Sequence, residues 1–367
     1  MSARPGYEQS TTGAPRIVPA PRVAGVTGYG IPRAKGEIDL PLDGNEGAAP
    51  SDTVVGLCAG IEPDTLRRYP STAGLAATFA ARWGVGVDRV LVTAGGDDAL
   101  DRLMRSMLCE GREIVFPVPS FEMIERYSRL AGGTIVEVPW PRGPYPRDAV
   151  LAAITERTAV VCVVTPNNPT GAVATFDDVR AVAEAAPHAV VLLDQAYAEL
   201  ADEDLTGPAL ALPNVVVVRS MSKAYGLAGL RIGYALGAPE IIGWMRAAAG
   251  PYAVSGPSIH VATRRLALPQ DDVKAYLARA RVEREALFGL LAELGFSPVP
   301  SQANFVFARV PDPIALRDAM ARRGIGIRAF PGKPHLGDAV RITVPGDEKD
   351  FERVCAALRA SAEEIAR

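Results

Sequence analysis

Residues 215–234 read VVVVRSMSKAYGLAGLRIGY and place a lysine just beyond a run of valines. The run Val215–Val218 is continuously apolar, which predicts a strand buried on both faces, as in a parallel sheet. Lys223 follows this strand, where an amine is costly to desolvate unless it is paired, and a desolvated amine is nucleophilic. The segment therefore predicts an α/β fold with a reactive lysine at the carboxyl end of a central strand.

The same alternation continues on the N-terminal side of this segment. Strand-like apolar runs separated by helical segments occupy residues 89–93, 113–116, 159–164 and 190–193. Because consecutive parallel strands need crossover connections, this pattern predicts a mostly parallel central sheet with helices on both faces.

The pattern of apolar residues changes beyond about residue 255. Residues 273–294 carry apolar side chains at helical spacing, and short strands and helices follow them. This pattern predicts a second, smaller α+β domain. We therefore expect an N-terminal arm over residues 1–44, a large domain over 45–255 and a small C-terminal domain over 256–367.

Composition excludes several classes of protein. The chain has 367 residues, 48% of them hydrophobic, which excludes a disordered chain, and its net charge of −3 argues against a nucleic-acid partner. The longest apolar runs are strand-sized and the first 16 residues lack a signal-peptide core, so we expect no membrane span and a cytoplasmic protein. Four scattered cysteines and three histidines predict neither a disulfide framework nor a metal site.

Polar residues follow the carboxyl ends of several predicted strands. Ligands of open parallel sheets bind at these ends, so the polar residues are candidates for a binding site. Gly96 and Asp97 begin a predicted helix after residues 89–93, and the free N–H groups at a helix N-terminus can bind an anion. The same residues are also typical of an ordinary strand-to-helix turn in which Asp97 is the helix N-cap. Residues 164–171 read VTPNNPTG, in which two prolines present Asn167 and Asn168 to a ligand.

Three more positions carry candidate binding groups. Asp194 ends the strand at 190–193 and could hold a cation such as a protonated ring nitrogen, or could cap a helix. Arg231 suits a phosphate because its planar fork donates in pairs. Arg341 lies inside an apolar strand and needs either a structural or a substrate carboxylate, and Arg328 poses the same alternative.

The strings SMSKAYGLAGLRIGY and VTPNNPTG resemble the class I/II pyridoxal-phosphate aminotransferases of the aspartate aminotransferase superfamily, and within it the histidinol-phosphate aminotransferases. The resemblance implies the fold of type I pyridoxal-phosphate enzymes and pyridoxal 5′-phosphate as cofactor. It implies that Lys223 binds the cofactor covalently and moves protons at the substrate Cα, while Asp194 pairs with the pyridinium nitrogen. Asn168 and Tyr197 would hydrogen-bond the phenolic oxygen, and Phe121 would stack on the ring.

The resemblance also assigns the cofactor phosphate, the partner and the substrate contacts. The phosphate would be cradled by Gly96, Asp97, Ser220, Ser222 and Arg231. Tyr69, in Arg-Arg-Tyr-Pro, would reach the phosphate of a neighbouring subunit, which implies a homodimer with shared sites. Arg341 would bind the α-carboxylate with help from Asn304, and Tyr29 and Arg328 would contact a distal substrate phosphate.

The chain departs from the family pattern at the segment that lines the substrate mouth. Asn45, a candidate substrate contact, opens the string Asn-Glu-Gly-Ala-Ala-Pro in place of the usual Asn-Glu-Asn-Pro-aromatic-Gly-Pro, and Phe121 replaces the more frequent tyrosine. We expect ping-pong amino transfer between histidinol phosphate and 2-oxoglutarate. The alternatives are an aromatic amino acid transaminase, a lyase that resembles phosphothreonine decarboxylase, and a binding protein without turnover on the same scaffold.

Overall fold

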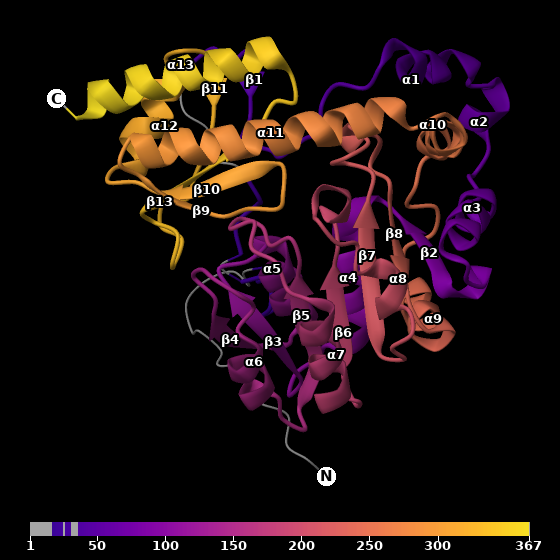
Figure 1. The fold of residues 1–367 in the computed structure, drawn as a ribbon. Helices are drawn as coiled ribbons and strands as arrows, with labels where there is room; N and C mark the ends of the chain where they lie inside the picture. The colour runs from indigo at the N-terminus through magenta and orange to yellow at the C-terminus, as the bar shows by residue number, and fades with distance from the viewer. Residues whose placement is uncertain (1–16, 25, 31–35, 367) are drawn as a thin grey trace.

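A central sheet of seven strands dominates the computed structural model, which describes residues 17–24, 26–30 and 36–366 (Figure 1). The strands are β2 (Val90–Thr93), β3 (Glu113–Val118), β4 (Thr134–Pro139), β5 (Thr158–Val164), β6 (Val190–Asp194), β7 (Val215–Ser220) and β8 (Gly233–Leu236). Their order is β2-β8-β7-β6-β5-β3-β4, and β8 runs in the direction opposite to the other six strands. The predicted α/β fold with a mostly parallel sheet is confirmed.

Helices cover both faces of this sheet. One face carries α4 (Gly95–Met107), α5 (Glu122–Ala131) and α9 (Pro239–Ala247), and the other carries α6 (Arg147–Ala153), α7 (Phe176–Ala185) and α8 (Thr206–Ala209). Alternate residues of β5 divide between the two apolar clusters, Val160 and Cys162 facing α4 and Val161 and Val163 facing α7. This double burial explains why the central strands are continuously apolar rather than alternating.

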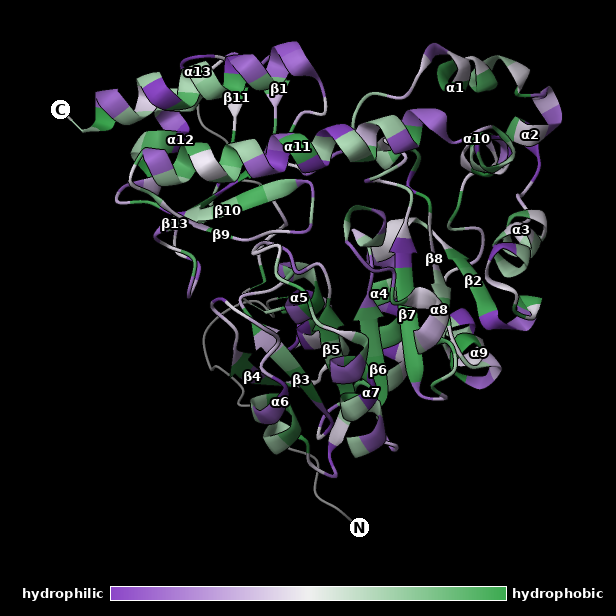
Figure 2. Ribbon diagram, viewed as in Figure 1, coloured by the Kyte–Doolittle hydropathy of each residue, from purple (hydrophilic) through white to green (hydrophobic). Residues whose placement is uncertain are grey.

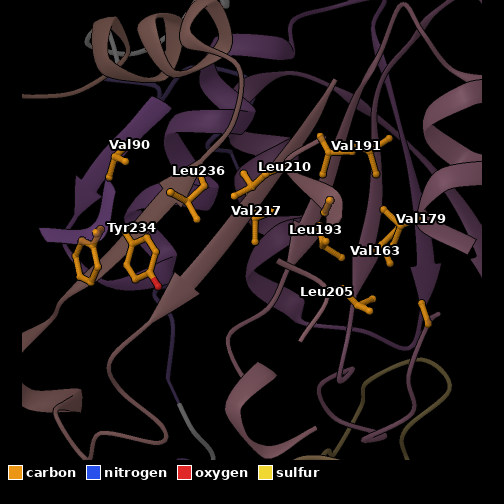
Figure 3. Packing of buried hydrophobic residues seen from close by; sticks show 14 of the residues in the cluster. Val90, Val163, Val179, Val191, Leu193, Leu205, Leu210, Val217, Tyr234 and Leu236 are labelled. Atoms are coloured by element: carbon orange, nitrogen blue, oxygen red, sulfur yellow. The ribbon is translucent and has the colours of Figure 1, made fainter. Parts of the chain in front are cut away.

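Hydropathy follows the same plan: the central strands are the greenest part of the ribbon in Figure 2. Figure 3 shows Val163, Leu193 and Val217 of neighbouring strands packing with Val179 of α7 and with Leu205, which directly precedes α8. Each fully buried side chain of this kind contributes about 1.5–3 kcal/mol. The core therefore anchors the strand ends, where the polar side chains emerge.

A second, antiparallel sheet of four strands forms from the C-terminal third of the described chain. Its order is β12 (Arg328–Ala329), β13 (Ala339–Thr343), β10 (Phe305–Arg309) and β9 (Ser297–Val299). The helices around it are α11 (Asp271–Glu293), α12 (Pro313–Ala321) and α13 (Glu348–Ile365) (Figure 1). The predicted smaller α+β part is confirmed.

The N-terminal residues join both parts. The two-residue strand β1 (Leu40–Pro41) pairs in parallel with β11 (Ile325–Gly326) of the C-terminal part. The helices α1 (Asp52–Gly56), α2 (Pro63–Arg67) and α3 (Ala73–Trp83) follow, and α10 (Gly256–Ala267) packs against α2 and α3. Short 3₁₀ turns complete the described elements: η1 (Leu57–Gly60), η2 (Val87–Arg89), η3 (Ala198–Leu200) and η4 (Ala228–Leu230).

The division into 1–44, 45–255 and 256–367 stays a prediction, and residues 1–16, 25 and 31–35 of the expected arm lie outside the described residues. None of the helices in the described ranges has the length and apolar character needed to cross a membrane.

Candidate active site

A cavity of about 920 Å³ opens between the carboxyl ends of the central strands and the four-stranded sheet. Fourteen of the sixteen site residues predicted from the sequence line it, and Tyr69 and Asn304 do not. The fourteen are Tyr29, Asn45, Gly96, Asp97, Phe121, Asn168, Asp194, Tyr197, Ser220, Ser222, Lys223, Arg231, Arg328 and Arg341. The fold thus brings together side chains from both ends of the chain.

Lys223 lies three positions beyond the end of β7 and its amine reaches the N-terminal segment. Its Nζ donates to the carbonyl oxygen of Asn45 at 2.8 Å and lies 5.4 Å from the centroid of the Tyr197 ring. A Cβ at Gly47 would lie 1.8 Å from the carbonyl oxygen of Lys223, so a glycine at this position lets the two backbones approach each other. The segment at the mouth is therefore packed directly against the lysine.

Asp194 ends β6 as a buried carboxyl group, 5% exposed, in the cavity wall. Burial raises its pKa to about 6, although its side chain accepts a hydrogen bond from the Ala196 amide at 3.0 Å and feels the positive charge of Lys223. A cationic ring nitrogen placed against this carboxylate would reverse the shift, because an opposite charge favours the ionised form.

Hydrogen bonds orient the two groups expected to meet the cofactor's phenolic oxygen. Asn168 accepts at Oδ1 from Nη1 of Arg341 at 2.6 Å, which leaves the amide N–H₂ of Asn168 as its free donor. Tyr197 accepts at its hydroxyl from Asn45 Nδ2 at 3.0 Å, and Thr343 donates to Asn45 Oδ1 at 2.7 Å. The Tyr197 O–H is therefore left to donate elsewhere.

An anion cradle lies at the N-terminus of α4. Arg231 donates through Nη2 to Asp97 at 3.1 Å and through Nη1 toward the Ser222 hydroxyl at 3.5 Å. Gly95 has a φ of +79°, and a Cβ there would meet Nη2 of Arg231 at 2.4 Å. Free backbone N–H groups, serine hydroxyls and a guanidinium form the donor set that suits a phosphate dianion. The residues present therefore fit the phosphate of pyridoxal phosphate.

Two buried arginines form the other end of the cavity. Arg328 on β12 and Arg341 on β13 are direct cross-strand partners, so their side chains share one face of the small sheet. Arg328 Nη1 and Arg341 Nε are buried without a hydrogen-bond partner among the described residues. The pKa of Arg341 is lowered to about 10, chiefly by burial, and the neighbouring charge of Arg328 acts in the same direction. Two adjacent buried cations call for an anion.

Sequence reasoning missed Glu122 and Lys333, two charged residues at this end of the cavity. Glu122 accepts from Arg328 Nη2 at 3.1 Å and pairs with Lys333 at 2.7 Å. Glu122 opens α5 and is typical of an acidic first helical turn, which conceals a contact with residues more than 200 positions away. No local signal points to that contact.

Tyr69 and Asn304 lie outside the cavity. Tyr69 is 82% exposed, stacks on Tyr252 at 4.5 Å between ring centroids and lines a separate depression. Asn304 is fully buried and donates to the Glu46 carbonyl at 3.0 Å and to the Tyr276 hydroxyl at 3.2 Å. Asn304 thus reaches the cavity through the backbone of Glu46, and the expected direct roles of both residues stay predictions.

Comparison with known proteins adds a family to this geometry. Residues 62–358 match the model of aminotransferase class I and II. An aromatic amino acid aminotransferase of Cutibacterium acnes is 36% identical, covering 92% of this chain and 96% of the relative. A histidinol-phosphate aminotransferase of Xanthomonas euvesicatoria pv. vesicatoria is 34% identical, covering 83% and 88%. The crystal structure of histidinol-phosphate aminotransferase from Sinorhizobium meliloti in complex with pyridoxal-5′-phosphate matches with a TM-score of 0.80 at 26% identity, over 90% of this chain and 92% of that one.

Proposed function

The chain belongs to the class I and II aminotransferases and is a pyridoxal-phosphate-dependent enzyme, and on that premise we propose that it transfers the amino group of histidinol phosphate to 2-oxoglutarate. The single observation that carries the proposal is the pair of buried guanidinium groups of Arg328 and Arg341, which lie side by side on the adjacent strands β12 and β13. The proposed setting is histidine biosynthesis in the cytoplasm.

The chemistry of the donor matches this pair. Histidinol phosphate carries a phosphooxymethyl group on Cα where an amino acid carries its carboxylate, so its anion is larger, doubly charged and further from Cα. Arg341 would receive the carboxylate of 2-oxoglutarate or glutamate, and Arg328, with the Tyr29 hydroxyl nearby, would add the contacts that a phosphate needs. Each of the two arginines keeps one buried nitrogen that has no hydrogen-bond partner within the described part of the chain, and a substrate oxygen would satisfy it.

The cavity's inner groups would hold the cofactor and handle the proton. Pyridoxal phosphate, when bound, supplies an electron sink for the electrons left at Cα when the substrate loses a proton. We propose that Lys223 Nζ takes that proton from Cα and returns it during transfer, since its amine lies in the wall of the cavity at the inner end. Asp194 would keep the ring nitrogen protonated, and Asn168 and Tyr197 would donate to the phenolic oxygen.

A second candidate function is amino transfer from aromatic amino acids. The observation that favours it is the ion pair between Arg328 and Glu122, which already neutralises one of the two cations at the outer end. The 36% identity to an aromatic amino acid aminotransferase is consistent with it. An uncharged ring could occupy this end without displacing the pair.

A panel of amino donors with 2-oxoglutarate as acceptor decides between the two. We expect the purified holoenzyme to show a higher kcat/KM for histidinol phosphate than for phenylalanine, tyrosine or histidinol. Turnover of phenylalanine without turnover of histidinol phosphate would overturn the first proposal and establish the second.

A further inference from the structure

Glu122 forms a bridge between two cations at the outer end of the cavity. Its Oε1 accepts from Arg328 at 3.1 Å, and its Oε2 lies 2.7 Å from the Nζ of Lys333. The Arg328 side chain is 6% exposed and that of Glu122 26%, so the Arg328–Glu122 pair is partly shielded from solvent. All three residues line the cavity.

The bridge lies where the substrate's anion is proposed to bind. Glu122 directly follows Phe121, whose ring lines the same cavity, and Arg328 is the cross-strand partner of Arg341. Tyr29 feels the same carboxylate: its pKa is raised by burial and next by the charge of Glu122. Glu122 therefore belongs to the electrostatic environment of the substrate end, although no motif marks it.

The carboxylate competes with any anion that approaches Arg328. One guanidinium nitrogen of Arg328, Nη2, already donates to Glu122, while Nη1 has no partner among the described residues. A phosphate dianion that binds Nη1 would come close to the carboxylate, and repulsion between like charges is weakly screened in a partly buried site. An uncharged substrate group leaves both ion pairs intact.

We infer that Glu122 is a specificity-determining residue of this site: its carboxylate competes with a substrate anion for the cations Arg328 and Lys333, and so weakens the binding of phosphate-bearing ligands more than that of uncharged ones. The inference rests on the proposed function in taking Arg328 as a substrate contact. It differs from a purely structural bridge between α5 and the segment after β12, which would affect all ligands alike.

The test uses two unreactive probes of identical body: 3-phenylpropyl phosphate and 3-phenylpropanol, titrated calorimetrically into the pyridoxal-phosphate holoenzyme. In the variant Glu122→Gln we expect the phosphate to bind about tenfold more tightly than in the wild type, because the repelling charge is gone and the side-chain volume is kept. The alcohol should change by less than about twofold. The matched control is Glu125→Gln, which removes a carboxylate from the same helix and cavity wall but one that pairs with Arg129 at 3.1 Å.

A second variant guards against a change of packing in the first. Lys333→Met removes a cation and should weaken binding of the phosphate by about threefold while sparing the alcohol. Equal changes for both probes in Glu122→Gln, or the same gain in Glu125→Gln, would overturn the inference. A wild-type enzyme that does not turn over histidinol phosphate, together with a phosphate-selective gain in Glu122→Gln, would refute the proposed function and leave the inference standing.

Discussion

The two ends of the cavity are built in different ways. The inner end takes its groups from the carboxyl ends of strands in one sheet: Asp194 ends β6, Lys223 follows β7, and Gly96 lies in the first turn of the helix after β2. The outer end takes Arg328 and Arg341 from the small sheet, Glu122 from α5 and Tyr29 from the N-terminal residues. The inner end depends on short motifs held by a rigid core, whereas the outer end depends on how separate parts of the chain meet. We therefore propose that the inner end carries the reaction chemistry and the outer end the choice of substrate.

The largest expected effect tests the inner end. Lys223→Ala should abolish the visible absorption band of the bound cofactor and lower transaminase activity by roughly 10⁴-fold, because the amine that moves the proton is lost. Absorption spectra and steady-state rates of the purified variant measure both. Lys274→Ala, at an exposed helical position, is the control. A spectrum unchanged from wild type in Lys223→Ala would contradict the assignment of the inner end.

The second prediction separates the two arginines of the outer end. Arg341→Met should lower kcat/KM for glutamate by about 100-fold, because a buried carboxylate contact is removed. Arg328→Met should lower kcat/KM for histidinol phosphate by about tenfold and leave glutamate within about threefold. Steady-state kinetics with both donors measure the difference. Equal losses for both donors in both variants would show that the outer end does not discriminate.

The third prediction asks whether a partner subunit completes the inner end. We propose a homodimer in which Tyr69 serves the neighbouring site, since Tyr69 is exposed and lies outside its own chain's cavity. Tyr69→Phe should lower activity by about tenfold through loss of one hydrogen bond to a charged group. Mixed dimers of Tyr69→Phe with Lys223→Ala should recover activity, because one site of the mixed dimer then holds both native residues.

Size-exclusion chromatography with light scattering measures the mass of the protein in solution and so its oligomeric state. Activity assays of refolded or co-expressed mixtures of the two variants measure how much activity is recovered. A monomer, or a mixture no more active than Tyr69→Phe alone, would place Tyr69 outside the reaction.

The smallest effect concerns Asp194 in the cofactor-free protein. Burial raises the pKa of Asp194 to about 6, above the value of about 3.9 for an unfolded aspartate. Ionisation therefore disfavours the folded state, and this carboxyl group makes stability fall as the pH rises from about 4 to 6. Asp194→Asn should raise the melting temperature of the cofactor-free protein by a few degrees at pH 8, and by less at pH 5.

Thermal denaturation at the two pH values measures this change. The same substitution should lower the activity of the holoenzyme, because the partner of the ring nitrogen is lost. An equal gain in melting temperature at both pH values would mean that packing, and not charge, explains the stabilisation.

Local sequence was sufficient for the inner end. The strings around Asn168 and Lys223 contain their own strand, turn and functional side chain, so their placement follows from one element. The same reasoning missed Glu122 and Lys333. It predicts that Asn304 helps to bind the substrate, which stays a prediction, and it did not foresee the contact of the Asn304 amide with the Glu46 carbonyl. Those contacts join segments that local patterns treat separately.

The sequence by itself determined the layered α/β architecture, because strands buried on both faces must be continuously apolar and their exits must carry the polar groups. It also predicted Lys223 as the reactive amine, and it indicated the family that the comparisons show. Only the tertiary structure decided that Arg328 and Arg341 lie side by side on adjacent strands and that Asn45 orients Tyr197. It also decided that Glu122 pairs with two cations at the outer end. The physical reason is the distance along the chain over which each property is decided. The apolar pattern of a strand or helix depends on residues that are close in sequence. The charge balance of a cavity depends on which distant side chains the packed core brings within a few ångströms of one another.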